Sequence, residues 1–320
     1  MSSAPTIPTT LNYVTLDVFT STPFAGNPLA IVQVPRGVSL TQVQKQIIAR
    51  EFNYSETVFL HEHGHTHLDD EDPSWTMDIF TTTDELPFAG HPTIGTACYA
   101  MSAFGAVRGK LNLKAGLVNV SYDLGTRRAR AAIPQNVHIH NATVAAEQLL
   151  AMQPSLDVRR DLTASGFLDL PRSPVVSIVP GMTFVLVQLP SLHSLATIGV
   201  SSGDVQVTLD PAWSPSFVSI YFYVLQPEAA DGTHNIRTRM MANGFEDPAT
   251  GSAASALAAF LALKRHRGGD RLRFLITQGV EMGRQSEIGI DVDTCPDGTI
   301  QQITLAGTAI KVMNGRIYLK

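Results

Sequence analysis

At residues 88–97 the chain reads Phe88-Ala89-Gly90-His91-Pro92-Thr93-Ile94-Gly95-Thr96-Ala97. A related pattern follows in the second half, at residues 247–253: Asp247-Pro248-Ala249-Thr250-Gly251-Ser252-Ala253. In both segments a protonatable side chain precedes a proline, and a glycine, a small hydroxyl residue and an alanine lead into an alanine-rich apolar stretch. Because proline suits the first position of a helix, the two segments predict helices over 92–104 and 248–264, with His91 and Asp247 at or near the N-caps.

The glycines in these segments let the backbone come close to a ligand, and a helix N-terminus favours an anion such as a substrate carboxylate. A plainer interpretation is that Asp247 is only an N-cap and that Gly95 and Gly251 only pack. The occurrence of the pattern in both halves favours a pseudo-twofold protein. Two helix N-termini would then hold a small carboxylate ligand between an acid and a base, in a cleft between two domains.

The composition agrees with a folded, two-domain protein. The chain has 320 residues, of which 44% are hydrophobic and 16% charged, enough apolar material for a core. Its net charge of −5 and the absence of a long basic run argue against a nucleic-acid partner. Its two cysteines, Cys98 and Cys295, cannot form a disulfide framework. The first 12 residues lack a signal sequence and the apolar stretch at 253–263 is too short to span a bilayer, so we expect a soluble, cytoplasmic protein that binds no membrane.

Strands dominate both halves. A helix is predicted from Ser39, with Gln42 at its capping-box position, and another over 142–152. The predicted strands cover 13–19, 29–34, 55–60, 76–80, 111–120, 128–133, 183–189, 217–225, 272–277, 288–292, 300–307 and 311–319. Many strands with few helices indicate an α+β protein. We expect a flexible N-terminus over 1–12, an N-terminal domain over 13–130 and a C-terminal domain over 131–309.

Glu56 is the first candidate for chemistry. It interrupts the apolar strand predicted over 55–60, where a carboxylate is costly unless it is paired or useful. If Val58 faces the core, Glu56 also points inward, with a raised pKa that would suit proton transfer at carbon near neutral pH. The alternative is a glutamate on an edge strand that faces water.

Other chemistries have weaker signals. His61, His63, His65 and His67 alternate and could bind a metal, although a solvated hairpin loop is the better interpretation of a segment with Gly64 at its middle. No Gly-rich nucleotide-binding loop is present.

Four blocks of the sequence together carry a resemblance to a known family. They are Val18-Phe19-Thr20 with Pro23-Phe24-Ala25-Gly26-Asn27-Pro28-Leu29-Ala30, then Ser55-Glu56-Thr57, then the segment 85–97, and finally the segment 246–253 with Gln278-Gly279, Met282-Gly283-Arg284 and Ser286. In these blocks the chain resembles the PhzF-like proteins (phenazine-biosynthesis isomerases), which share the diaminopimelate-epimerase fold. The resemblance extends from about residue 13 to the C-terminus.

The resemblance implies two pseudo-symmetric domains, each a curled, mostly antiparallel sheet or barrel around a central helix, with the last strand (about 310–320) returning to the N-terminal domain. It implies a homodimer that needs no cofactor and no metal. It gives Glu56 the role of general acid/base, and His91 and Asp247 the role of assisting polar residues. The substrate-binding positions that it implies are Asn27, Gly90, Gly251 and Ser252.

The expected function is therefore that of a cofactor-independent isomerase. It would move a proton between carbons of a small, unsaturated metabolite of secondary metabolism, which we expect to carry a carboxylate. Alternatives are a proton-triggered cyclase or lyase on the same site, a non-catalytic small-molecule binding homologue, and an epimerase by other means. A two-thiol racemase is disfavoured because no cysteine lies at the two motif positions. The segments 61–75 and 135–235 match the family poorly, so the substrate stays open.

Overall fold

The computed structural model describes residues 10–62, 72–156, 172–201, 203–242, 244–265 and 268–319. It divides the chain into two compact units. The N-terminal unit contains Met1–Ala132 together with Ala306–Lys320, and the C-terminal unit contains Ile133–Leu305. Of the four alternating histidines that could bind a metal, His63, His65 and His67 lie outside the described residues.

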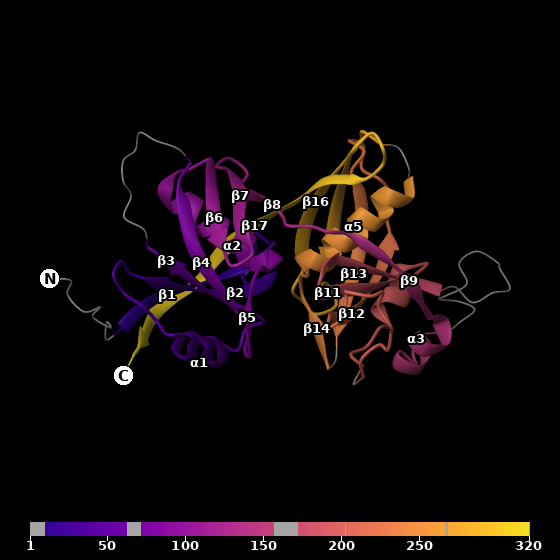
Figure 1. Cartoon of the computed structure of the whole chain (residues 1–320), viewed down its shortest axis with the longest axis horizontal. Coiled ribbons are helices and arrows are strands. Elements are labelled where there is room, and N and C mark those ends of the chain that lie inside the picture. The colour runs from indigo at the N-terminus through magenta and orange to yellow at the C-terminus, as the bar shows by residue number, and fades with distance from the viewer. Residues whose placement is uncertain are drawn as a thin grey trace. The chain divides into compact units, whose positions relative to one another are not determined.

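The N-terminal unit is a closed barrel (Figure 1). Among the described residues, eight strands pair in the ring β1-β2-β3-β4-β6-β7-β8-β17 and back to β1. The pairs β2–β3 and β4–β6 are parallel, and a short strand, β5, adds to β4. The elements are β1 (Thr10–Val18), β2 (Asn27–Val34), α1 (Gln42–Phe52), β3 (Thr57–His61), β4 (Ser74–Phe80), β5 (Glu85–Leu86), α2 (Gly90–Phe104), β6 (Arg108–Leu113), β7 (Gly116–Asp123), β8 (Arg128–Ala132) and β17 (Ile300–Tyr318).

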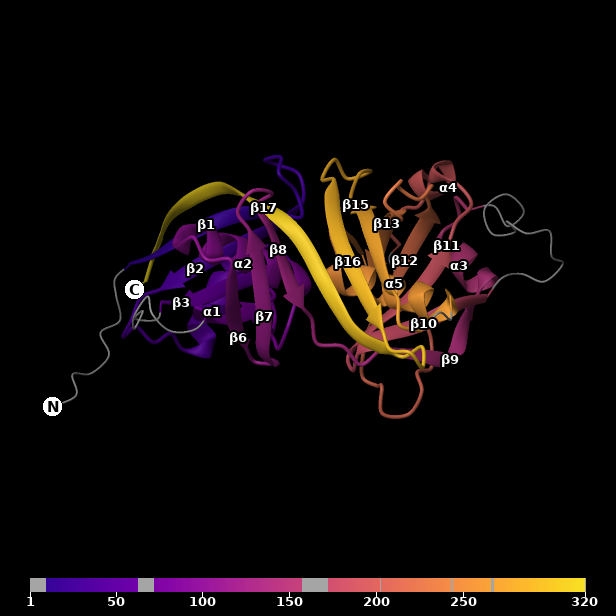
Figure 2. The same ribbon diagram turned by 90° about the horizontal axis from the view of Figure 1, so that it is seen from above.

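Strand β17 begins in the C-terminal unit and ends in the N-terminal unit, where it pairs with β1 from Ala309 to Tyr318. Figure 2 shows it as one long strand, in yellow. The helix α2 packs against β1, β2, β7 and β8 and is buried over most of its length. Gly95 explains how closely it packs, because a Cβ atom there would lie 2.5 Å from Leu29 Cδ2 and 2.8 Å from Val18 Cγ2.

The C-terminal unit repeats the same order of strand pairing. The sheet runs β9-β10-β11-β12-β13-β15-β16, with β14 added to β13, and the pairs β11–β12 and β13–β15 are parallel. Its central helix α5 packs against β10, β11, β15 and β16. The elements are β9 (His138–Ala145), α3 (Ala146–Met152), β10 (Arg172–Val179), β11 (Met182–Gln188), α4 (Leu192–Ala196), β12 (Phe217–Leu225), β13 (His234–Ala242), β14 (Phe245–Asp247), α5 (Gly251–Arg265), β15 (Arg271–Gln278) and β16 (Ser286–Thr294).

The two units therefore have equivalent topologies. The alternation of antiparallel and parallel pairs along β1-β2-β3-β4-β6-β7 returns along β10-β11-β12-β13-β15-β16, and α2 and α5 occupy the same place in that order. This confirms the predicted α+β class, with two pseudo-symmetric halves built around a central helix.

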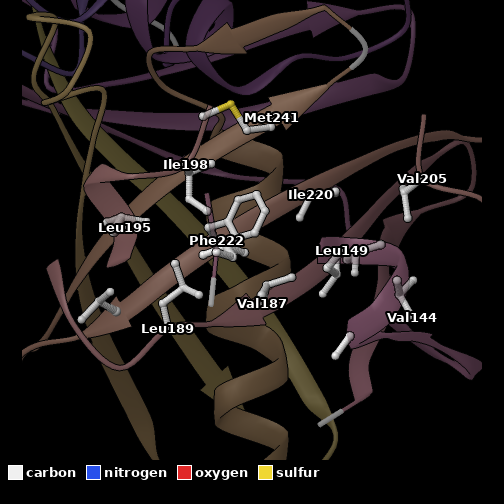
Figure 3. Close-up of a cluster of buried hydrophobic side chains, with 14 of the residues drawn as sticks. Val144, Leu149, Val187, Leu189, Leu195, Ile198, Val205, Ile220, Phe222 and Met241 are labelled. Atoms are coloured by element: carbon white, nitrogen blue, oxygen red, sulfur yellow. The ribbon is translucent and has the colours of Figure 1, made fainter. Parts of the chain in front are cut away.

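A second layer covers the other side of the sheet in the C-terminal unit (Figure 3). Leu149 of α3 and Leu195 of α4 pack in one cluster with Val187 of β11 and Phe222 of β12, all of them at most 1% exposed. Burying such side chains contributes about 1.5–3 kcal/mol each. The cluster thus anchors two short helices that have little stability of their own.

Several local predictions were wrong. The single strand predicted over 111–120 is instead two antiparallel strands, β6 and β7, joined by a turn. The N-cap of α1 is Thr41, which forms a capping box with Gln44, and not Ser39 with Gln42. Residues 142–145 end strand β9, and the predicted helix starts only at Ala146, because Thr143–Ala145 pair with Arg172–Pro174. Neither proline occupies a first helical position: Pro92 is the third residue of α2, and Pro248 precedes α5.

Among the described residues, no helix is both long and apolar enough to cross a membrane.

Candidate active site

Glu56 lies immediately before β3, at the end of a tight connection from α1. The helix ends at Asn53, whose left-handed conformation (φ 53°) turns the chain toward the sheet. Thr57 then pairs with Ala30 in the parallel β2–β3 ladder. Strand β3 is thus two residues shorter at its start than the predicted strand over 55–60, and Glu56 is held by the turn and by the first residue of the strand.

His91 faces Glu56 from the start of α2. The distance between His91 Nδ1 and Glu56 Oε2 is 3.4 Å, and the two side chains are 5% and 18% exposed. His91 is the second residue of α2, whose N-cap is Ala89. The prediction put His91 at or near the N-cap, and it lies in the first turn, where the helix dipole favours a negative charge nearby.

The environment of Glu56 changes its acidity. Burial raises the pKa of its carboxyl group to about 7, against a smaller opposing effect of a hydrogen bond with the Ser55 side chain. Its Oε2 atom is fully enclosed and makes no hydrogen bond of good geometry with the described residues. A carboxyl group with this pKa is populated in both protonation states near pH 7 and can both accept and donate a proton.

Asn27 and Gly90 belong to the same unit. Asn27 is the first residue of β2, is 1% exposed and pairs with Val18. Gly26 precedes it with a φ of 68°, and a Cβ atom there would lie 2.3 Å from the carbonyl oxygen of Val18, so only glycine fits. Gly90 is the first residue of α2 and is buried.

Asp247 lies in the C-terminal unit, as the last residue of β14. The Thr250 hydroxyl donates a hydrogen bond to its Oδ2 atom at 2.6 Å. The Gln278 side-chain amide donates to the Asp247 carbonyl oxygen at 2.7 Å and to the Thr250 hydroxyl at 3.1 Å. These bonds fix the carboxylate and the backbone of Asp247 together.

Two further buried residues hold Gln278. The Tyr221 hydroxyl donates to Gln278 Oε1 at 2.9 Å and accepts a hydrogen bond from the Thr238 hydroxyl at 3.0 Å. Tyr221, Thr238 and Gln278 are all completely buried. The sequence gives no role for these three residues, because β12, β13 and β15 each carry other polar side chains and nothing in a single strand singles out Tyr221, Thr238 or Gln278.

Gly251 and Ser252 are the first two residues of α5, and the Ala254 amide donates to the Thr250 carbonyl oxygen at 3.0 Å. The equivalent bond in α2 runs from Thr93 to Ala89 at 3.2 Å. Thr250 and Ala89, which accept these bonds, are therefore equivalent positions. The residue after each is a glycine, Gly251 or Gly90, and Ser252 then corresponds to His91. The alignment of His91 with Asp247 through the prolines was therefore wrong in structural terms, because Asp247 precedes its helix and His91 lies within its own.

The structure thus brings Glu56, His91, Asn27 and Gly90 into one unit, and Asp247, Gly251 and Ser252 into the other. That all seven act in one site stays a prediction. A cavity of about 390 Å³ in the N-terminal unit is lined by Leu60, Trp75, Tyr99 and Phe104 with their neighbours, at the far end of α2 from His91. It is not the predicted pocket around Glu56.

The cysteine in the N-terminal unit is unsuited to thiol chemistry. Cys98 is 4% exposed within α2, and its Sγ atom donates to the Gly307 carbonyl oxygen at 3.7 Å. Burial raises the pKa of this thiol to about 12, so the reactive thiolate is scarce at neutral pH. This agrees with the prediction that disfavours a two-thiol racemase.

The comparisons with known proteins agree with one another. The model of the family described as phenazine biosynthesis-like protein, PhzC-PhzF, matches residues 16–315. The chain is 31% identical to an uncharacterized isomerase of Mesorhizobium japonicum, over 97% of this chain and 99% of the relative. It is 30% identical to the trans-2,3-dihydro-3-hydroxyanthranilate isomerase of Pseudomonas aeruginosa, over 96% of this chain and 99% of the relative.

The fold has a solved counterpart in the crystal structure of the phenazine biosynthesis protein of the PhzF family from Bacillus anthracis. The TM-score is 0.75 at 22% sequence identity, with 97% of this chain and 99% of that chain covered. The resemblance stated from the sequence motifs is thereby confirmed. On its matched residues, its relatives and its fold, the chain belongs to the phenazine biosynthesis-like (PhzC-PhzF) family and is an isomerase.

Proposed function

We propose that this isomerase moves a proton between carbons of a small, carboxylated, unsaturated metabolite, with Glu56 as the general acid/base and without a cofactor. The observation that carries the proposal is the largely buried Glu56 carboxyl group, 3.4 Å from His91 and with a pKa of about 7. General acid–base catalysis is most effective when the pKa of the catalytic group lies near the working pH.

In the proposed reaction, the Glu56 carboxylate removes a proton from one carbon of the substrate. The electron pair left behind is delocalised through the adjacent double bond. The carboxylic acid then returns the proton to a different carbon, which moves the double bond and leaves the enzyme in its starting state. His91, next to the carboxyl group, adjusts its proton affinity and orients it.

The first turns of α2 and α5 supply groups suited to a carboxylate. The free backbone amides at a helix N-terminus can donate hydrogen bonds to an anion. Both helices have glycine at the first position, which leaves room for the anion. We assign substrate binding to Gly90, Gly251 and Ser252, with Asn27 near the start of β2. Asp247 is proposed as a second polar group that assists proton transfer, held by Thr250 and Gln278.

The substrate named for the Pseudomonas aeruginosa relative is the first compound to test. Wild type and Glu56→Gln would be incubated with trans-2,3-dihydro-3-hydroxyanthranilate in D2O, and proton exchange and product would be followed by NMR. We expect turnover by the wild type and a loss of about 10²–10⁴-fold in Glu56→Gln. Glu51→Gln, an exposed glutamate of the same unit, is the matched control and should keep full activity.

Equal turnover by wild type and Glu56→Gln would overturn the role of Glu56. Release of a cyclised or fragmented product would instead assign the same site to a cyclase or lyase. If neither protein turns this compound over, the same deuterium-exchange measurement on other carboxylated alkenes tests the reaction class separately from the substrate.

A further inference from the structure

A second cluster of chemically capable side chains lies in the C-terminal unit and includes none of the candidate catalytic or substrate-binding residues. His138 and His140 are two positions apart on β9, so that they share a face of the strand. Asp210 comes from the segment that leads into β12. One ligand atom from each of the three lies within 4.8 Å of the others, and His138, His140 and Asp210 are the one such group found among the described residues.

The distances in this cluster are close to those of a metal site. His138 Nε2 lies 2.8 Å, and His140 Nδ1 3.9 Å, from Asp210 Oδ2. Bonds of about 2.0–2.1 Å in a tetrahedral site separate neighbouring ligand atoms by about 3.3 Å. The two observed distances lie on either side of that value, so small movements of the side chains would give three well-placed ligands.

The surroundings fix the tautomer of His140. Its Nδ1 atom accepts a hydrogen bond from the Asp210 backbone amide at 3.1 Å, so the ring proton is assigned to Nε2, which donates to the Ser177 hydroxyl at 2.8 Å. Ser177 is linked in turn to the Thr183 hydroxyl at 2.7 Å. A metal-binding histidine usually donates its other ring N–H in this way, with its lone pair toward the ion.

The other two ligands are also held in place. The indole ring of Trp213 stacks on His138, with ring centres 4.7 Å apart and planes within 10°. The Asn141 side chain donates to Asp210 Oδ2 at 3.2 Å. The exposed fractions are 33% for the His138 side chain, 17% for Asp210 and 0% for His140, so an ion could enter from the His138 side.

Other histidine–carboxylate pairs in the described part of the chain lack this third ligand. His61 pairs with Asp78, but the Lys45 ammonium group occupies the same carboxylate oxygen at 2.6 Å and would repel a cation. His234 pairs with Glu228. A histidine–carboxylate pair with no third ligand serves as a hydrogen bond that stabilises the fold. The cluster of His138, His140 and Asp210 differs because two imidazoles and a carboxylate converge on one point, as the ligands of a metal ion do.

We propose that His138 Nε2, His140 Nδ1 and Asp210 Oδ2 bind a divalent transition-metal ion of the Zn²⁺ type, with water completing its coordination. The ion would replace the hydrogen bond between the Asp210 amide and His140. It would also displace the proton that His138 Nε2 donates to Asp210 Oδ2, which moves to His138 Nδ1 or is released to water. It would tie the segment before β12 to β9, within the C-terminal unit. Glu56 belongs to the other unit, and the proposed isomerisation does not depend on this ion.

The test uses the full-length chain, stripped with a chelator. Isothermal titration with Zn²⁺ and the visible absorption of bound Co²⁺ would give affinity, stoichiometry and geometry. We expect one ion per chain in the wild type and at least about 100-fold weaker binding in His138→Gln and His140→Gln. His234→Gln, which removes a histidine outside this cluster, is the matched control and should bind as the wild type does.

His138→Cys keeps a ligand at the same position and guards against misfolding of the glutamine variants. It should bind Co²⁺ and add an intense near-ultraviolet absorption from a thiolate bound to the metal. The proposal is overturned if the wild type binds no Zn²⁺, or if Co²⁺ added to His138→Cys gives no thiolate absorption. It is also overturned if His138→Gln and His140→Gln bind Zn²⁺ as tightly as the wild type does, which is the result expected if the histidines at 61–67 bind the ion instead.

Discussion

Nδ1 of His91 lies 3.4 Å from Oε2 of Glu56, and both side chains are largely buried in the N-terminal unit. Because burial raises its pKa, the Glu56 carboxyl group binds a proton more readily in the folded protein than in the unfolded chain. Two measurable consequences follow, one for stability and one for catalysis.

Glu56 should make the folded protein less stable as the pH rises. Its pKa is raised from 4.5 to about 7, so the folded state retains a proton that the unfolded state has lost between these values. The Glu56 carboxyl group does not affect the free energy of unfolding below about pH 4.5. Between pH 4.5 and 7 the free energy of unfolding falls, and above pH 7 the loss is complete. Its size is on the order of 3 kcal/mol, at 1.36 kcal/mol for each unit of difference in pKa. Urea denaturation of Glu56→Gln should show a gain over wild type at pH 8 that shrinks at pH 5. A difference that does not vary with pH contradicts this account, and the exposed Glu51→Gln should show none.

His91 should matter for turnover more than for folding. His91→Asn keeps a polar side chain but removes the ring beside Glu56, and we expect kcat to fall by about 10²-fold or more. The dependence of kcat/KM on pH should show an apparent pKa near 7 in the wild type, from Glu56. Steady-state kinetics across a range of pH on both sides of this value would test both expectations. A wild-type rate in His91→Asn would remove His91 from the mechanism.

Tyr221 should support Asp247 through Gln278. Tyr221→Phe deletes the hydroxyl that joins Thr238 to Gln278 and leaves two buried groups without that partner, at a cost of about 1–3 kcal/mol. If Asp247 is catalytic, kcat should also fall while KM changes less. Tyr223→Phe is the matched control, because its hydroxyl makes a longer hydrogen bond of 3.3 Å to Gln188. Denaturation and kinetics of both variants would separate the two effects; equal behaviour of the two would argue against the network.

The sequence predicted the fold well because its signals were local and repeated. Alternating apolar residues predicted most strands, and the two glycine-containing segments predicted both central helices. The errors arose where two local signals competed. Ser39 and Thr41 each have a glutamine three residues later, so both match the capping-box pattern. In the folded chain Leu40 is buried in the core and Thr41 is the N-cap of α1. At residues 142–145 the alanines suit a helix but the β-branched Thr143 and Val144 suit a strand, and pairing with β10 decides for the strand.

The candidate site was predictable only in part. Glu56 and His91 were found because a polar residue interrupted an apolar segment or preceded a proline. The network that holds Asp247 was not, because Gln278 and the Tyr221 that fixes it are 57 residues apart and meet only through the order of strands in the sheet. The same holds for His140 and Asp210, which lie 70 residues apart. Such contacts have no signature within a short window of sequence.

The N-cap of α1 can be tested directly against the alternative. Thr41→Ala removes the side chain that accepts from the Gln44 amide and should lower the free energy of unfolding by about 1 kcal/mol. Ser39→Ala, at the position first predicted as the cap, should change it by less than about 0.5 kcal/mol, as a surface substitution does. Thermal or urea unfolding of the two variants gives the comparison, and a larger loss from Ser39→Ala would restore the other cap.

Gly95 should prove to be a packing residue. A Cβ atom at this position would lie 2.5 Å from Leu29 Cδ2 and 2.8 Å from Val18 Cγ2, inside the contact between α2 and the strands β1 and β2. Alanine is the better helix former, so in an open position Gly95→Ala would stabilise α2 by up to about 1 kcal/mol. Here the overpacking should outweigh that gain and destabilise the N-terminal unit by about 1–3 kcal/mol. Gly199→Ala is the control, since a Cβ atom there meets nothing within 4 Å. Denaturant unfolding of both variants decides the sign: stabilisation by Gly95→Ala would show that α2 can move away from the sheet, and that the glycine is kept for another reason.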